Sequence, residues 1–276
     1  MILKLCLILA AVYAALRVLA VLRMEKPAIN EDNPYLHPEK KNALPKDQRQ
    51  FAGQIAPQPA CSRIYDRVWK RALDAVLSFF ALVLLSPLLV ILMLAVFIDD
   101  PGPVLFTQTR VGRDKTYFRL HKFRSMKMST PHDTPTHLLT NPEQYITRVG
   151  RFLRKSSLDE IPQVWDIFVG NMSIIGPRPA LWNQDDLIAE RDKYGANDVR
   201  PGLTGWAQIN GRDELEIPVK AKLDGDYVRV LKQGGWKAFA IDCRCFLGTI
   251  FSVLRSDGVV EGGTGELHKQ KETVRT

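Results

Sequence analysis

Two long runs of apolar residues interrupt an otherwise mixed chain of 276 residues. The first, residues 2–22, is long enough to cross a bilayer, for which about 20 residues are needed. It contains Lys4 and Arg17, and Arg17 lies close enough to Arg23 for both side chains to reach one interface. Neither a basic cluster before the run nor a small-residue cleavage site after it is evident, so we interpret it as an uncleaved membrane anchor. A cleaved signal peptide and an amphipathic helix on the membrane surface are the alternatives.

The second apolar run, residues 75–98, carries no charge and has Ser86-Pro87 near its middle. Each half would form roughly 17 Å of helix, which is too short to cross a hydrocarbon core of about 30 Å. The proline removes a backbone hydrogen bond, and the Ser86 hydroxyl is placed to satisfy the carbonyl freed one turn back. Lysine and arginine residues flank both ends, which places both in the cytoplasm by the positive-inside rule. The residues alone fit either a re-entrant helix-break-helix or a proline-kinked spanning helix.

The pattern beyond the second run predicts a mixed helix and strand domain. Strand-like runs at 104–108 and 117–123, separated by a turn at 112–115, predict a β-hairpin. Residues 236–254 alternate apolar and charged groups at helical spacing, which predicts either an amphipathic helix in the membrane interface or a helix packed on the core. The other elements that we expect are a helix carrying the cations at 148–155, a charged helix at 180–194 ending at Gly195, a loop-strand-loop over 202–212, and a helix around 220–227.

Composition narrows the classes of partner. The formal charge of +8 implies anionic partners, and seven of the cations fall between residues 110 and 127, where we expect most of them to attract anionic lipid. The four cysteines lack zinc-site spacing and are expected to be reduced thiols, and His132 and His137, in a polar loop, make a poor metal site. The aromatic residues do not alternate with cations as in single-strand binders, so we expect no nucleic acid partner.

Candidate chemistry centres on Asp159 and Glu160. Cations spaced three to four residues apart precede them, and the following segment indicates a serine cap and a new helix start with Pro162 near its first turn. A carboxylate at a helix N-terminus is stabilised as an anion, so we expect Asp159 to stay ionised and to serve as a nucleophile. Glu160 is then expected to be free to bind a metal. A solvated helix start is the plain alternative for this pair of carboxylates.

Two further segments suit phosphate and nucleotide recognition. Proline residues on both sides of Arg178 restrict the backbone, so its guanidinium is presented rigidly, as bidentate contact with phosphate requires. A stiff loop whose arginine pairs with a local carboxylate is the alternative. Gln208, Asn210 and Arg212 lie in a glycine-rich segment whose amides suit a base or sugar and whose cation suits phosphate.

These residues resemble the monotopic phosphoglycosyl transferases, also called bacterial sugar transferases. The resemblance covers roughly residues 66–260 and rests on motifs in one order. These are Lys70-Arg71-Ala72-Leu73-Asp74, Lys122-Phe123-Arg124-Ser125-Met126, Asp159-Glu160, Gly176-Pro177-Arg178-Pro179 and the segment from Arg200 to Arg212. One departure is Asp166, where relatives more often carry Asn.

The resemblance implies an α/β membrane-associated fold in which a re-entrant membrane hairpin, broken at Ser86 and Pro87, carries a small cytoplasmic catalytic domain with interfacial amphipathic helices. It favours re-entry over a kinked spanning helix, with the protein in the bacterial inner membrane. The expected organisation is an N-terminal anchor at 1–23, a proline-rich linker at 24–65, the membrane hairpin at 66–100, the catalytic domain at 101–256 and a tail at 257–276.

The resemblance also implies a reaction, in which a sugar 1-phosphate passes from a UDP-sugar to polyprenyl (undecaprenyl) phosphate and UMP is released. Asp159 would be the nucleophile that carries the phosphosugar, and Glu160 would be a ligand of Mg²⁺. Phosphate would be held by Lys122, Arg124, Arg154, Arg178 and Arg212, and the nucleotide or sugar by Gln208 and Asn210.

The competing interpretation is a membrane-tethered binding or scaffold protein that uses its basic surface for anionic partners. The intact pair of carboxylates at Asp159 and Glu160 argues against it. The sugar, the glycan pathway and a homo-oligomeric state are left open by the residues.

Overall fold

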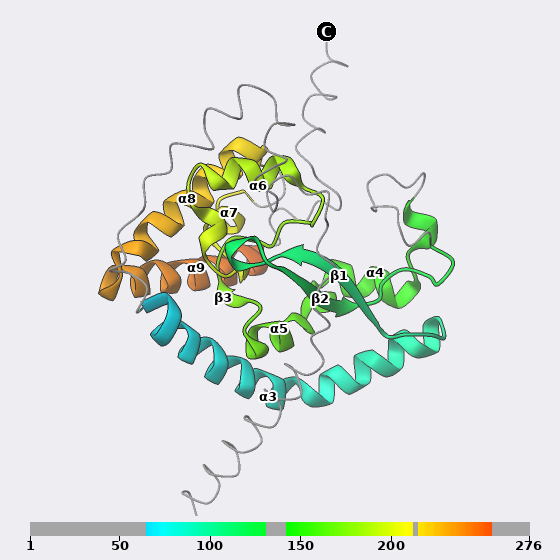
Figure 1. Cartoon of the computed structure of the whole chain (residues 1–276). Coiled ribbons are helices and arrows are strands. Elements are labelled where there is room, and N and C mark those ends of the chain that lie inside the picture. The colour runs from blue at the N-terminus through cyan, green and yellow to red at the C-terminus, as the bar shows by residue number, and fades with distance from the viewer. Residues whose placement is uncertain (1–64, 131–141, 212–214, 256–276) are drawn as a thin grey trace, which may run out of the picture. The chain divides into compact units, whose positions relative to one another are not determined.

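A computed structural model of the chain describes residues 65–130, 142–211 and 215–255 (Figure 1). The predicted anchor at 1–23, nearly all of the linker at 24–65, most of the polar loop with its two histidines, Arg212 and the tail at 257–276 lie outside the described residues. The described part is a mixed helix and strand domain with one long apolar helix, in line with the expected α/β membrane-associated fold.

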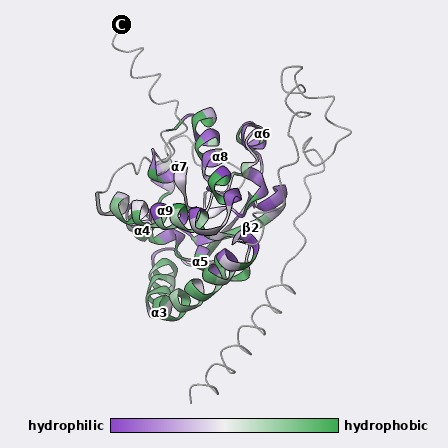
Figure 2. Cartoon of the chain, turned by 90° about the vertical axis from the view of Figure 1, so that its left-hand side faces the viewer, coloured by the Kyte–Doolittle hydropathy of each residue, from purple (hydrophilic) through white to green (hydrophobic). Residues whose placement is uncertain are grey.

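The long helix is α3, Lys70–Asp99, preceded by a π-turn at Tyr65–Trp69. It is long and apolar enough to cross a membrane, and only 11% of its most apolar window is buried against the protein. Figure 2 shows that its residues are mostly hydrophobic, and Figure 1 shows that it changes direction near its middle. Pro87 lies inside it, and the Ser86 hydroxyl donates to the Val83 carbonyl at 2.8 Å, which confirms the predicted compensation. The expected break between two helices is a bend within one continuous helix.

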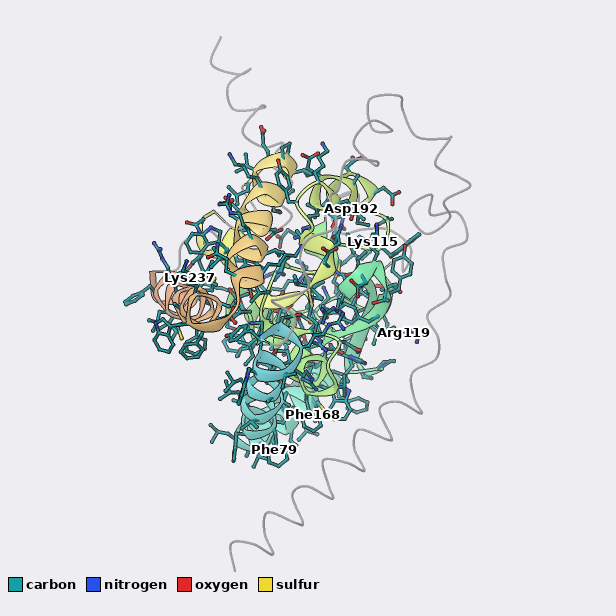
Figure 3. All side chains as sticks on the ribbon, turned by 60° about the vertical axis from the view of Figure 1, so that its left-hand side comes forward. Phe79, Lys115, Arg119, Phe168, Asp192 and Lys237 are labelled. Atoms are coloured by element: carbon teal, nitrogen blue, oxygen red, sulfur yellow. The ribbon has the colours of Figure 1, made fainter. Side chains whose placement is uncertain are left out.

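Both ends of α3 are bound by the same polar domain. Near its start, Arg71 donates to the Ile167 and Phe168 carbonyls, and Asp74 accepts the Ile174 backbone N–H at 3.1 Å. At its end, Asp99 accepts the Val149 N–H at 2.8 Å. Between these points the Phe79 and Phe168 rings lie 6.2 Å apart, where α3 meets α5, Gln163–Val169 (Figure 3). The helix therefore lies along the domain with one face packed and the other exposed.

The predicted hairpin is present as β1, Leu105–Val111, and β2, Tyr117–Phe123, which pair antiparallel with Phe106 opposite Lys122. Its turn places Asp114 and Lys115 in the left-handed region. A second sheet pairs β3, Ser173–Ile175, in parallel with β4, Gly202–Thr204.

The helices differ from expectation mainly at their ends. The charged helix predicted at 180–194 begins only at Asp185, because residues 179–181 pair instead with the end of β1, where the Val111 N–H donates to the Ala180 carbonyl. The segment after β4 turns into a short helix rather than a loop. The helices are α4, Arg148–Lys155; α6, Asp185–Asp192; α7, Trp206–Ile209; α8, Ile217–Gln233; and α9, Gly235–Arg255.

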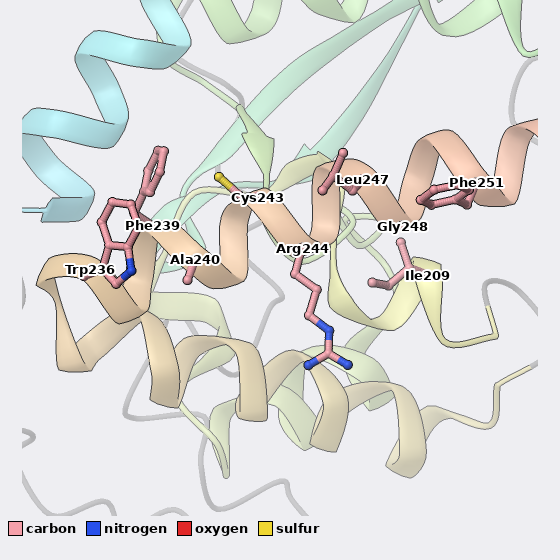
Figure 4. A pocket seen from close by; sticks show the side chains of 9 residues that line it. All are labelled: Ile209, Trp236, Phe239, Ala240, Cys243, Arg244, Leu247, Gly248 and Phe251. Carbon is pink, nitrogen blue, oxygen red and sulfur yellow. The ribbon is translucent and has the colours of Figure 1, made fainter.

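Helix α9 packs on the core along one side, as one of its two alternatives predicts, and exposes large apolar residues on the other. Ala238 and Cys245 are fully buried against α8, while Trp236, Leu247 and Phe251 are exposed. An open groove of about 540 Å³ runs along the exposed side (Figure 4). Its lining is almost entirely apolar.

The cations between residues 110 and 127 are mostly not a lipid-facing patch, contrary to expectation. Arg113 pairs with Asp66 at 3.0 Å, and Lys115 pairs with Asp192 at 2.9 Å, as Figure 3 shows for the latter. Arg124 is 7% exposed and pairs with Asp100. Each of these cations connects the hairpin to another element and is neutralised there.

Asp242 of α9 is the buried acceptor that connects three helical segments. It is 8% exposed, and its carboxylate accepts hydrogen bonds from Lys70 at 2.7 Å, from Tyr65 at 3.0 Å and from Tyr227 at 2.8 Å. The start of the apolar helix is thereby fixed to α8 and α9. Removing one partner of a buried ion pair leaves an uncompensated charge, which typically costs about 3–5 kcal/mol.

We predict that Asp242→Ala lowers the melting temperature of the detergent-solubilised protein by roughly 10 °C, because Lys70 and two tyrosine hydroxyls lose their acceptor. Differential scanning fluorimetry measures the shift. The matched control is Asp226→Ala, which removes an exposed pair with Arg229 and is expected to change little. Equal shifts in the two variants would contradict the role of Asp242.

Candidate active site

Asp159 and Glu160 lie in a short 3-10 turn, Leu158–Glu160, between α4 and α5. Two serines shape the approach, but not as the predicted cap. The Ser156 hydroxyl donates back to the Phe152 carbonyl at 2.7 Å and closes α4, while Ser157 adopts a left-handed backbone (φ 56°) and makes no side-chain capping bond. Pro162 directly precedes α5, as predicted. The chain thus turns sharply at the two carboxylates.

The Asp159 carboxyl is less acidic than expected. Burial raises its pKa, the neighbouring Glu160 charge raises it further, and Lys122 and Arg154 lower it, so that the result is about 6. The expectation that a helix N-terminus would hold Asp159 in its ionised form is therefore wrong in its cause. A turn of three residues supplies little macrodipole, and desolvation of the carboxylate outweighs it.

Glu160 is paired with Arg178, which reaches it from the loop after β3. The Arg178 Nη2 lies 2.6 Å from Oε1 and Nη1 lies 3.4 Å from Oε2. Burial raises the pKa of Glu160, but Arg178 together with Lys122 and Arg110 outweighs burial and lowers it. We expected Glu160 to be free to bind a metal, and it is instead paired. The alternative prediction, an arginine paired with a local carboxylate, is the one that the structure has.

The rigid presentation of Arg178 is explained by two backbone bonds to β4 from the residues directly before it. The Gly176 N–H donates to the Thr204 carbonyl at 2.8 Å, and the Gly202 N–H donates to the Pro177 carbonyl at 2.9 Å. Side chains are excluded here, since a Cβ on Gly202 would lie 2.1 Å from the Gly176 nitrogen. The loop is therefore hydrogen-bonded to β4 directly before Arg178, and Arg110 binds the Pro179 carbonyl directly after it.

Lys122 faces the two carboxylates from β2. It lies 5.3 Å from the centre of the Phe106 ring, and burial followed by the nearby Arg110 lowers its pKa to about 8. Arg154 of α4 completes this side, with its Nε donating to the Ser125 hydroxyl at 2.8 Å. Both cations act electrostatically on Asp159.

Arg110 is a member of the cluster that the sequence did not single out. Its guanidinium donates to the Pro179 carbonyl at 3.0 Å and to Gln108 at 2.8 Å, and burial beside Arg178 lowers its pKa to about 10. The available signal was its position at the end of the predicted hairpin, but its contact with the loop around Arg178 depends on pairing between distant segments.

The remaining predicted site residues are placed differently. Arg124, expected to contact phosphate, instead binds Asp100 at the end of α3 through side chain and backbone, because burial at 7% exposure requires a counter-charge. Asn210 donates to the Trp206 carbonyl at 2.7 Å. Both amide atoms of Gln208 are buried without a partner among the described residues, next to the contact of Gly205 with Gly176.

Asp166, where the resemblance leads to an expectation of Asn, is fully buried behind the site. It accepts the His121 backbone N–H and contacts His121 Nδ1, both at 2.9 Å. The bond to Asp166 outweighs burial and raises the pKa of His121. Since His121 directly precedes Lys122, this pair fixes the strand that carries the site lysine to α5.

The resemblance to known proteins covers the part of the chain that contains these site residues. The bacterial sugar transferase family matches residues 65–256. The UDP-glucose:undecaprenyl-phosphate glucose-1-phosphate transferase of Escherichia coli is 41% identical over 177 residues, 59% of this chain and 37% of that protein. The uncharacterized sugar transferase EpsL of Bacillus subtilis is 35% identical over 192 residues, 70% of this chain and 90% of that protein. The exopolysaccharide production protein PSS of Rhizobium leguminosarum is 35% identical over 199 residues, 68% of this chain and 96% of that protein. The chain thus spans little more than a third of the length of the Escherichia coli relative and most of the two shorter ones.

We predict that Asp159→Asn raises the melting temperature at pH 7.5, because a carboxyl whose folded pKa is about 6 rather than 3.8 is ionised at a cost to the fold. The cost is absent below pH 3.8, grows between 3.8 and about 6, and is complete above that range. The gain of the variant over the natural protein therefore shrinks as the pH is lowered from 7.5 to 4, as thermal melts across this range will measure.

The matched control is Asp186→Asn, which changes an exposed aspartate of α6 in the same way. It is expected to give no gain at any pH. A loss of stability in Asp159→Asn at pH 7.5 would contradict the raised pKa.

Proposed function

The chain belongs to the bacterial sugar transferase family, and on that premise we propose that it transfers a sugar 1-phosphate from a UDP-sugar to polyprenyl phosphate, releasing UMP. The observation that carries the proposal is one desolvated carboxylate, Asp159, set among the cations of three separate elements. A reaction on a diphosphate needs a nucleophile and several fixed positive charges, and the site supplies both. The names of relatives that act on undecaprenyl phosphate support the same substrates.

The proposed mechanism has two displacements at one phosphorus atom. An Asp159 oxygen attacks the β-phosphorus of the UDP-sugar, forms an acyl phosphate bond, and the bond from that phosphorus to the bridging oxygen breaks as UMP leaves. An oxygen of polyprenyl phosphate then attacks the same phosphorus and displaces the aspartate. Two steps let a soluble nucleotide and a lipid use the site in turn. With a pKa of about 6, Asp159 is largely ionised at neutral pH but poorly solvated, which favours attack.

The cations have distinct parts in this proposal. Lys122 has a pKa of about 8. A bound diphosphate would stabilise its protonated form, so a larger fraction of Lys122 would be positively charged when the substrate is bound. Arg154 lies on the α4 side of the nucleophile and Arg178 on the loop side. Arg110 supports Arg178 from behind by holding the Pro179 carbonyl, and the buried amide of Gln208 is a candidate contact for the base or sugar.

Mg²⁺ is part of the proposal with Glu160 as its protein ligand. The described residues contain no group of three metal-binding side chains, so the residues fit only an ion held largely by substrate phosphate oxygens, which is the usual manner for Mg²⁺. Its chemistry would be to offset diphosphate charge. Without substrate, Glu160 holds Arg178, so the incoming phosphate and ion would exchange partners with this pair.

For the membrane we propose re-entry of α3, with both ends and the catalytic domain on the cytoplasmic side of the bacterial inner membrane. The support is that one polar domain binds Asp74 and Asp99, 25 residues apart on the helix. A straight helix of that length would measure about 38 Å, more than the roughly 30 Å hydrocarbon core. If it spanned, one of these contacts would have to form on the far side of the bilayer. The exposed apolar side of α9 (Figure 4) would lie in the same interface.

We predict that the purified chain releases UMP from at least one member of a panel of UDP-sugars when polyprenyl phosphate is present, and that Asp159→Asn reduces the release to no more than a few per cent. The amide keeps the shape and removes the nucleophile. A luminescent UMP assay gives the rates. Asp186→Asn should retain full activity, and EDTA should stop a reaction that Mg²⁺ then restores. Absence of UMP with every sugar, or robust activity in Asp159→Asn, would refute the mechanism.

The topology is tested by single cysteines at Arg67 and Val104 in a variant without the native four. Both sites are expected to react with a membrane-impermeant thiol reagent from the cytoplasmic side of inner-membrane vesicles, because the bent helix returns. Pro87→Leu restores a backbone donor and helix propensity of about 3 kcal/mol, so it should shift labelling towards opposite sides. Labelling from opposite sides with Pro87 intact would disprove re-entry.

A further inference from the structure

Helix α4 carries more positive charge than the reaction centre uses. Its sequence contains four cations and no acidic residue, and three of the cations, Arg148, Arg151 and Lys155, are exposed. Arg148 lies in the first turn, where a cation opposes the helix dipole. Folding alone gives no reason for this placement, so the charge calls for an anionic partner.

The position of α4 limits what that partner is. The helix lies beside the C-terminal half of α3 (Figure 1), where Leu153 packs with Leu92 and Val96 in one buried cluster. Phe152, next in sequence, is 59% exposed although it is a large aromatic residue. An exposed aromatic beside cations on a helix attached to a membrane element is the pattern of a lipid headgroup contact.

The side chains around α4 form an ordered path. At about 100° per residue, five of them follow one another around the exposed side of the helix. Phe152 comes first, next to Val149 and the apolar helix; the last, Arg154, is the cation that acts on Asp159. The order is Phe152, Arg148, Lys155, Arg151 and Arg154.

We propose that this face of α4 is the entry track for the lipid acceptor, a long-chain isoprenoid phosphate monoester, and that Arg148, Lys155 and Arg151 pass its phosphate from the headgroup level to Arg154. The inference rests on the proposed function and adds to it the route of one substrate. Charge complementarity selects the lipid phosphate, and the continuity of the track with the apolar helix selects a substrate that arrives from the bilayer. A nucleotide arriving from water has no need of Phe152.

The test compares a triple variant, Arg148→Gln, Arg151→Gln and Lys155→Gln, with the natural protein in vesicles of phosphatidylcholine alone. The expected result is a KM for polyprenyl phosphate raised roughly 10- to 100-fold, from the effect of each cation near an anionic group. The single-turnover burst of UMP, which needs only the UDP-sugar, is expected to be unchanged. The matched control neutralises Lys193, Lys222 and Arg229, exposed cations of the segment after α6 and of α8, and should leave both quantities unchanged.

Two further arms decide the outcome. A difference that appears only when phosphatidylglycerol is added would show a general site for anionic phospholipid and overturn the proposal, as would an unchanged KM with an intact burst. Failure of the burst in the natural protein would instead count against the proposed function. In that case, binding of polyprenyl phosphate is measured without turnover, by ³¹P line broadening in phosphatidylcholine nanodiscs. The triple variant is expected to lose this broadening. Broadening that persists in the triple variant would overturn the proposed track.

Discussion

The constraint on which this structure depends is that a single polar domain is bound to both ends of one apolar helix. At the start of the helix, the three charged residues of the segment Lys70 to Asp74 make these contacts. Lys70 donates to Asp242, Arg71 donates to carbonyls at the end of α5, and Asp74 accepts a backbone N–H of β3. At the other end Asp99 and Asp100 accept from α4 and Arg124. The domain therefore cannot move away from the apolar helix, and Asp159 and Glu160 are held at a fixed position beside it.

At the candidate active site, charged groups are buried close together and partly compensate one another. Burial raises the pKa of Asp159 although cations lie near it, and burial also lowers the pKa of the nearby Lys122 to about 8. Such an arrangement is costly while empty and becomes favourable when an anion enters. The Glu160 pair with Arg178 keeps one of these cations compensated in the meantime.

Local pattern was enough to predict the hairpin, helices α8 and α9 and the Ser86 bond to Val83, because each depends on neighbours within a few residues. Local pattern could not predict that Arg110 belongs to the site, because it binds the Pro179 carbonyl about 70 residues away. It also could not predict that Arg124 pairs with Asp100 and not with a phosphate. The pKa of Asp159 was missed for a related reason. Desolvation is set by what packs over a group, and the helix-terminus argument considered only the backbone beneath it.

The parallel pairing of β3 with β4 has a consequence for how the chain can change over time. The backbone leaves this pair at Pro177 and returns to it at Gly202, and the two points are joined by a direct hydrogen bond. The segment between them, which includes α6, is therefore a long loop whose two ends are joined by this hydrogen bond. Arg191 of α6 is buried and pairs with Asp224 of α8 at 2.6 Å, so α6 is fixed as well. A change in chain length at the exposed residues Trp182 and Asn183 is therefore the one expected to leave Arg178 in place.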